Sequence, residues 1–181
     1  MACEVLLGRK IPCKDGAAGL LSVFFLNSPF KVKFTGLYIS DIQKIDDTAV
    51  TLYKYELDNT AANFVENVVG DRNNGTFFNE QILTLALQTL QDRDLAEIEN
   101  LAKGRPAVIV QYRNGKLRLA GIERGMDTSG NNASGGDLGD FQGYNLTLTA
   151  KENSYAPLLL DYSLADPFGG LTTPPTIVVG V

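Results

Sequence analysis

The fold is decided by residues 75–121, which read GTFFNEQILTLALQTLQDRDLAEIENLAKGRPAVIVQYRNGKLRLAG. Leu83, Leu85 and Leu87 alternate with polar or small residues, so residues 76–87 are predicted to form a strand with one apolar face. The apolar period then changes to that of a helix; its apolar stripe comprises Leu95, Ile98, Leu101 and Ala102. A short helix with a single apolar stripe is expected to lie on one face of a sheet.

The predicted helix has matching signals at its ends. Thr89 or Asp92 can cap the N-terminus, because a short side-chain oxygen accepts free backbone N–H groups there. Gly104 suits the left-handed residue that closes a helix, and Pro106 prevents its continuation. A strand is expected at 107–112, and the Asn-Gly pair at 114–115 predicts a hairpin to a returning strand at 116–120.

Outward from this stretch, apolar runs predict a mainly β fold. Residues 20–26 form a continuous apolar run, typical of a strand buried on both faces. Alternating runs predict half-buried strands of a mainly antiparallel sheet, at 31–39, 49–57, 62–69 and 144–151. Several of these strands are longer than a small sandwich needs, so we expect some to extend beyond the core as hairpins. The polar, acidic residues 40–48 separate two of the runs, with Asp46 and Asp47 on a loop.

The chain is expected to form one domain at 20–152 with two arms. Residues 1–19 are predicted to be an irregular N-terminal arm, and residues 153–181 a C-terminal arm rich in Pro and Gly. Residues 125–140 are rich in Gly, Asn, Ser and Asp and are predicted to be a long loop. The apolar, β-branched end at 176–181 should pair with a sheet edge, either of its own chain or of a neighbour.

Composition excludes several classes of function. The net charge of −5 argues against tight nucleic-acid binding, which needs a basic surface. The chain has no histidine, which excludes Ser/His and Cys/His catalysis. Cys3 and Cys13 are expected to be reduced in a cytoplasmic protein, with a disulfide between them as the minor alternative. We find no transmembrane run and no signal peptide.

No catalytic, cofactor-binding or metal-binding residues are assigned, and the protein is not expected to be an enzyme. A calcium site is one interpretation of Asp127, Asp137 and Asp140, but their spacing matches no known calcium loop, which favours a solvated loop. Paired carboxylates can serve acid–base catalysis, and the sequence has two such pairs, Asp46–Asp47 and Glu97–Glu99. We expect the first pair on a loop and the second on an exposed helix face, so a solvated surface explains both pairs better than catalysis. Residues 103–105 (Lys-Gly-Arg) suit phosphate, but helix capping already explains them.

Several strings within about residues 60–152 resemble structural tail proteins of tailed bacteriophages that infect Bacteroidetes. The tail tube family is the nearest, and the ring proteins of crAss-like phages are a close variant. The strings, in order, are NGTFF at 74–78, LTLAL at 83–87, LAKGRP at 101–106, LAGIERG at 119–125, GDLGDFQGY at 136–144 and LTLTAKE at 146–152. The resemblance implies a β-sandwich or half-barrel with one flanking helix.

The resemblance also implies a function. Subunits would place their sheets edge to edge in a hollow ring, a hexamer or dodecamer, through which DNA passes without specific binding. Arms and loops would contact stacked rings and adjacent tail or portal-proximal ring proteins, in a virion tail assembled in the host bacterial cytoplasm, with no membrane partner. An acidic channel wall would let DNA slide by repelling phosphate. The expected oligomer contacts are Ile177, Val178, Val179, Asp127, Asp137 and Asp140.

Two alternatives remain open at this stage. An inner-tube protein of a contractile secretion system would have the same fold in a secreted role. A monomeric β-sandwich that binds a ligand through its Gly/Asp-rich loop is the alternative from the binding-module class, and the absence of tryptophan counts against a sugar ligand.

Overall fold

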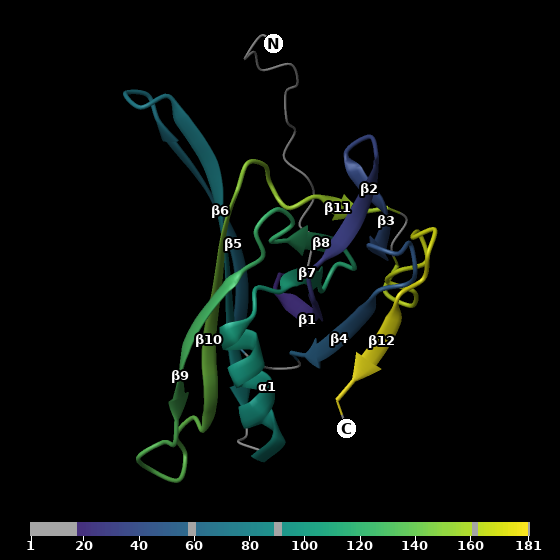
Figure 1. Ribbon diagram of the computed structural model, residues 1–181. Coiled ribbons are helices and arrows are strands. Elements are labelled where there is room, and N and C mark those ends of the chain that lie inside the picture. The colour runs from purple at the N-terminus through teal and green to yellow at the C-terminus, as the bar shows by residue number, and fades with distance from the viewer. Residues whose placement is uncertain (1–17, 58–60, 89–91, 161–162, 181) are drawn as a thin grey trace.

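The computed structural model describes residues 18–57, 61–88, 92–160 and 163–180. In these residues two β-sheets and one α-helix are present (Figure 1). The strands are β1 (Leu20–Leu26), β2 (Phe30–Thr35), β3 (Tyr38–Lys44), β4 (Thr51–Glu56), β5 (Ala62–Asp71), β6 (Thr76–Gln88), β7 (Ala107–Tyr112), β8 (Leu117–Ala120), β9 (Asp127–Ala133), β10 (Gly143–Glu152), β11 (Leu158–Leu159) and β12 (Thr176–Val179), and the helix is α1 (Asp92–Lys103). The fold is mainly β, as the alternating sequence pattern predicts.

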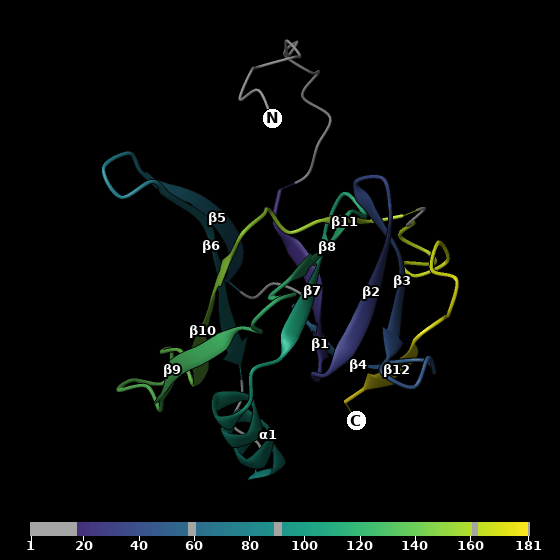
Figure 2. The ribbon, with the colours of Figure 1, turned by 45° about the horizontal axis from the view of Figure 1, so that its top comes forward.

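The larger sheet curls into a half-barrel (Figure 2). Its strand order is β12-β4-β1-β7-β8-β11-β3-β2. Neighbouring strands are antiparallel, except that β11 runs parallel to β3 and β12 parallel to β4. A backbone bridge between Gln43 and Ala49 joins the end of β3 to the approach to β4, which draws distant parts of the sheet together.

The smaller sheet is antiparallel throughout, with the order β5-β6-β10-β9. Its central strand β6 spans 13 residues, which is about 40 Å at about 3.3 Å per residue. The far end of the β5–β6 hairpin projects beyond the rest of the protein (Figure 1), and β5 is exposed from Asn67 to Asp71. This arrangement confirms that some long strands extend past the core as a hairpin.

Two hydrophobic cores lie on opposite faces of the central strands β1 and β7. Val23 and Phe25 of β1 contribute to the core between the two sheets, with Leu83 and Leu85 of β6. Phe24 lies instead in the core inside the half-barrel, where its ring meets that of Phe168 edge-on, with the centroids 5.0 Å apart. The continuous apolar run at 20–26 therefore reflects burial on both faces, as predicted.

Helix α1 lies at one end of the core between the sheets. Leu101 is buried in that core and Ile98 packs against it. The other two residues of the predicted apolar stripe are exposed, Leu95 at 52% and Ala102 at the helix end, so only half of the stripe is packed. The predicted left-handed helix end at Gly104 is wrong. The φ angle of Gly104 lies outside the left-handed region, and its N–H donates to the Asn100 oxygen at 2.9 Å, which continues the helical pattern. The proposed Thr89 cap lies outside the described residues.

Two other sequence predictions are corrected. The run at 31–39 is not one strand, because Gly36, at a φ of 64°, turns the chain between β2 and β3. Strand β3 then continues through Lys44 into the polar stretch 40–48, where Ile42 is buried. The predicted loop at 125–140 begins instead as strand β9, which pairs with β10 from Asp127 to Ala133. These polar residues extend because a neighbouring strand supplies the hydrogen-bond partners.

The C-terminal arm returns to its own sheet. Strand β12 pairs in parallel with β4, from Thr176 opposite Thr51 to Val179 opposite Lys54. Before β12, the Asp41 carboxylate is buried and accepts hydrogen bonds from the backbone N–H and the hydroxyl of Thr173, at 3.0 and 3.3 Å. Phe168 and Leu171 fill the half-barrel core. The segment is therefore packed on the domain, whereas most of the N-terminal arm lies outside the described residues.

Candidate functional site

The two outer strands of the smaller sheet have open edges. Strand β5 pairs with β6 and strand β9 with β10, and among the described residues no strand pairs with the opposite edge of either. Successive strands alternate in direction, so β5 and β9 run in opposite directions. An open strand edge presents unpaired N–H and C=O groups that can pair with another chain.

The smaller sheet also has a free face, opposite the core. By strand register this face carries Asn63, Val65, Asn67, Val69, Phe78, Glu80, Ile82, Thr84, Asn145, Thr147, Thr149, Lys151, Ser129 and Asn131. Hydroxyl and amide side chains dominate its centre. Glu80 lies directly opposite Lys151, so these two charges balance, and Lys151 also lies 5.3 Å from the centroid of the Phe78 ring. By the same register Asp71 and Asp127 also lie on this face, and Asp127 pairs with Arg105, so the face is polar and mildly acidic.

The three aspartates predicted as oligomer contacts do not form one group. Asp127 begins β9 and makes an ion pair with Arg105, which follows α1, at 3.0 Å. Asp137 and Asp140 lie beyond the other end of β9, in the turn that leads to β10. Asp140 accepts the N–H groups of Gly136 and Asp137, both at 2.9 Å, and these bonds lower the pKa of its carboxyl. In the described residues no group of three acidic, His or Cys side chains is arranged to hold a metal.

The three apolar residues predicted as oligomer contacts lie on an edge strand. Ile177, Val178 and Val179 of β12 are 42%, 42% and 51% exposed although β12 pairs with β4. Their exposed surface is on the half-barrel, at a different edge from that of β5 and β9. The prediction that they contact another subunit stays a prediction.

A buried polar cluster joins the two sheets where the β5–β6 hairpin leaves the core. The Arg118 guanidinium of β8 contacts the Glu66 carboxylate of β5, which also accepts the N–H of Ala156 at 2.6 Å. Beside Glu66, the Gln81 side chain accepts the N–H of Gly121 at 3.0 Å. These side chains bond the backbone of two connecting segments that lack sheet partners, which explains their burial.

Glu152 extends this cluster at the end of β10. Its carboxylate is buried and accepts N–H groups from Glu123 at 3.2 Å and from Arg124 at 3.4 Å. Burial raises the pKa of Glu152, and the Glu123 charge adds to this effect, while the two N–H groups oppose it. Opposite Glu152, the Asn79 amide is buried with no hydrogen-bond partner for either polar atom among the described residues.

Besides Asp41, Glu66 and Glu152 are buried carboxylates that the sequence analysis did not single out. Neither lies in a motif, but alternation gives a signal for both, because Glu66 shares the strand face of Phe64 and Glu152 shares that of Leu148 and Ala150. Both are occupied by backbone N–H groups or by Arg118, so their geometry is that of a structural support rather than of an acid–base pair.

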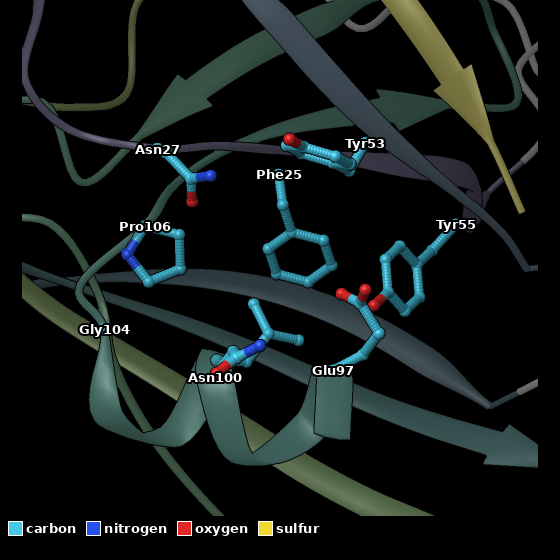
Figure 3. A pocket seen from close by; sticks show the side chains of 9 residues that line it. Phe25, Asn27, Tyr53, Tyr55, Glu97, Asn100, Gly104 and Pro106 are labelled. Atoms are coloured by element: carbon cyan, nitrogen blue, oxygen red, sulfur yellow. The ribbon is translucent and has the colours of Figure 1, made fainter. Parts of the chain in front are cut away.

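A pocket of about 220 Å³ lies between α1 and the strands β1 and β4. Figure 3 shows the rings of Phe25, Tyr53 and Tyr55 on one side and Glu97 and Asn100 of the helix on the other. The pocket is thus aromatic with one carboxylate. It is an open depression on the surface rather than an enclosed cavity.

The other charged candidates have local roles. Asp46 accepts both the hydroxyl and the N–H of Thr48, which lowers the pKa of Asp46. Glu99 pairs with Lys103 one helical turn later, at 2.9 Å. The Lys-Gly-Arg segment at 103–105 therefore has both of its cations engaged, the lysine with Glu99 and the arginine with Asp127.

Comparisons with protein-family models, with curated proteins and with solved structures gave no match. Among the described residues, no helix has the length and apolar character needed to span a membrane. The features available for a functional argument are therefore the open edges, the free face and the exposed turns of the smaller sheet.

Proposed function

We propose that the chain is a virion structural protein that oligomerises into a hollow ring or tube of a bacteriophage tail and forms part of the channel for DNA ejection. The observation that carries the proposal is the open β5 and β9 edges at opposite sides of one antiparallel sheet. The sequence resemblance at 60–152 covers this sheet and supports the same reading.

Strand directions favour ring closure through these edges. Rotation about an axis roughly along the strands preserves strand direction, so β9 of one subunit would meet β5 of the next in the antiparallel sense. Each subunit would then add four strands to a continuous antiparallel sheet. A head-to-tail contact of this kind closes when the rotation per subunit fits a whole number of copies.

The same arrangement supports a channel. The half-barrel and α1 cover one face of the smaller sheet, so the bulk of each subunit would lie outside the ring and the free face would line the lumen. That face offers threonine and asparagine side chains with the opposed charges of Glu80 and Lys151. DNA would pass because the mildly acidic wall has no net attraction for phosphate, in keeping with the acidic wall expected from total charge.

The first test is the mass of the purified protein in solution together with negative-stain microscopy. Hollow rings or tubes are the expected result. A compact monomer at high concentration would contradict the proposal and favour a ligand-binding module.

Cross-linking then tests which edges meet. In a variant with Cys3 and Cys13 replaced by serine, Asn63→Cys on β5 is combined with Ser129→Cys on β9, which lie in one row of the sheet, and a short bis-maleimide is added. We expect a ladder of covalent oligomers from the double variant and at most dimers from each single variant. A second pair, Lys33→Cys with Val178→Cys, tests the rival contact between the half-barrel edges; a ladder from this pair alone would refute the β5–β9 contact.

A further inference from the structure

The β5–β6 hairpin ends in a turn that presents one cation. The Asp71 carboxylate accepts the N–H of Asn73 at 2.8 Å and the side-chain amide of Asn74 at 2.6 Å, so its charge is directed at its own turn. Arg72 makes no ion pair with the described residues and is exposed. Phe77, just after the turn, is 58% exposed.

The turn between β9 and β10 has the complementary composition. Asp140 is directed inward, at the N–H groups of Gly136 and Asp137. The Asp137 carboxylate makes no ion pair with the described residues and is exposed. Leu138 is fully exposed, at 111%. Each turn thus has one aspartate that shapes it, one outward charge and one outward apolar side chain.

The two turns lie at opposite ends of the same sheet. Thr76 begins β6 at the hairpin turn, whereas Gly143, which follows the other turn, pairs with Gln88 at the far end of β6. The separation is therefore about the length of β6, about 40 Å, and both views show the turns at opposite ends (Figures 1 and 2). This distance prevents contact within one subunit, while translation along the strands brings the turns of two copies together.

We propose that the hairpin turn of one copy docks on the β9–β10 turn of another copy, with Arg72 paired to Asp137 and Phe77 packed against Leu138. The docking partner is a second copy of this chain. The two turns carry opposite charges at opposite ends of the sheet, so shifting a copy along the strands places its negative turn next to the positive turn of its neighbour. The inference rests on the proposed function and adds to it the contact by which rings stack into a tube. A charge-assisted arginine–carboxylate pair has a defined geometry and so orients the two turns. The exposed aromatic ring adds apolar surface that is buried in the contact.

Charge reversal tests the contact in the full chain. Arg72→Glu and Asp137→Arg are examined singly and together by negative-stain microscopy and by mass in solution. Each single reversal is expected to leave rings intact and to shorten mean tube length at least tenfold, and the double variant is expected to restore it. Lys116→Glu, in the exposed β7–β8 turn, makes the same change in charge as Arg72→Glu and should leave tube length unchanged.

Leu138→Ser is the second variant, because a fully exposed side chain can be replaced without disturbing the core. It is expected to shorten tubes while ring formation stays the same. Three outcomes would overturn this contact and leave the ring proposal standing. They are stacking that the single reversals do not change, rings that never stack, and a double variant that does not recover the tube length of the wild type. A wild-type protein that stays monomeric would instead overturn the ring proposal itself.

Discussion

Replacing Glu152 tests the buried polar cluster that fixes the end of β10. Its carboxylate holds the N–H groups of Glu123 and Arg124, and burial raises its pKa above the ordinary value of 4.5. A folded-state pKa above the unfolded value means that the folded protein binds the proton more tightly. The contribution of Glu152 to stability is therefore fully present below about pH 4.5 and is lost as the pH rises through the raised pKa.

Two replacements separate the charge from the hydrogen bonds. Glu152→Gln keeps an acceptor oxygen and removes the charge, whereas Glu152→Leu removes both. The two N–H bonds are 3.2–3.4 Å long and only part-buried, so we assign about 1 kcal/mol to each, the value of an ordinary intramolecular hydrogen bond rather than of a strong bond to a charged acceptor. Glu152→Leu should then lose about 2 kcal/mol of unfolding free energy and Glu152→Gln less than about 1 kcal/mol.

Urea denaturation of the wild type and both variants from pH 4.5 to pH 8 gives the free energies of unfolding. The wild type should lose stability relative to Glu152→Gln as the pH rises. Carboxylates with a lowered pKa, such as Asp46 and Asp140, make the free energy of unfolding rise with pH instead. They do so equally in all three proteins, so their effect cancels when the wild type is compared with a variant. A pH-independent difference would refute the raised pKa, and equal stability of the Gln and Leu variants would refute the hydrogen-bond argument.

Three further predictions concern packing and the arm. Phe24→Ala and Phe25→Ala, which open different cores, should each cost about 3–5 kcal/mol in urea denaturation; a small loss from either would show that its core is loosely packed. Gly143→Ala should lower Tm by several degrees, because the added Cβ would lie 2.0 Å from the Leu87 oxygen; an unchanged Tm would contradict that close approach. Deleting 176–181 should cost less than about 2 kcal/mol, since β12 is half exposed, and should weaken assembly more than folding; unchanged ring formation would count against an arm contact.

The regular elements with a strong local signal follow from the sequence. The hairpin of β7 and β8 has its Asn-Gly turn with Gly115 at a φ of 86°, as the pair predicts. Helix α1 packs through the apolar stripe that the spacing of Ile98 and Leu101 defines. In each case the information lies within a few residues, because the periods of helices and strands and the conformational freedom of glycine are local properties.

The strand β9 shows where sequence patterns are insufficient. Its residues, Asp127–Ala133, have the composition of a loop and form a strand because β10 offers a paired edge along their full length. Gly130 fits there because a Cβ would lie 2.3 Å from the Asn145 oxygen. The identity of the neighbouring strand, and so the reason for the glycine, is a long-range fact.

For the candidate site, the sequence found the exposed aspartates but not their surroundings. Asp137 and Asp140 lie in one turn as their spacing suggests, while Asp127 lies at the other end of β9. Nothing in the sequence places Arg72 and Asp137 at opposite ends of one sheet, since their positions depend on the register of β5, β6 and β10.

By itself, then, the sequence determined a mainly β chain, one amphipathic helix and a strand β1 that is buried on both faces. It also determined a β-branched C-terminal segment that is expected to pair with a sheet edge. Only the tertiary structure decided that this segment pairs with β4, that Glu66 and Glu152 are buried, and which edges and face of the smaller sheet remain open. The physical reason is that periodicity and turn chemistry act over a few residues, whereas strand partners, register and burial depend on contacts between residues far apart in the chain.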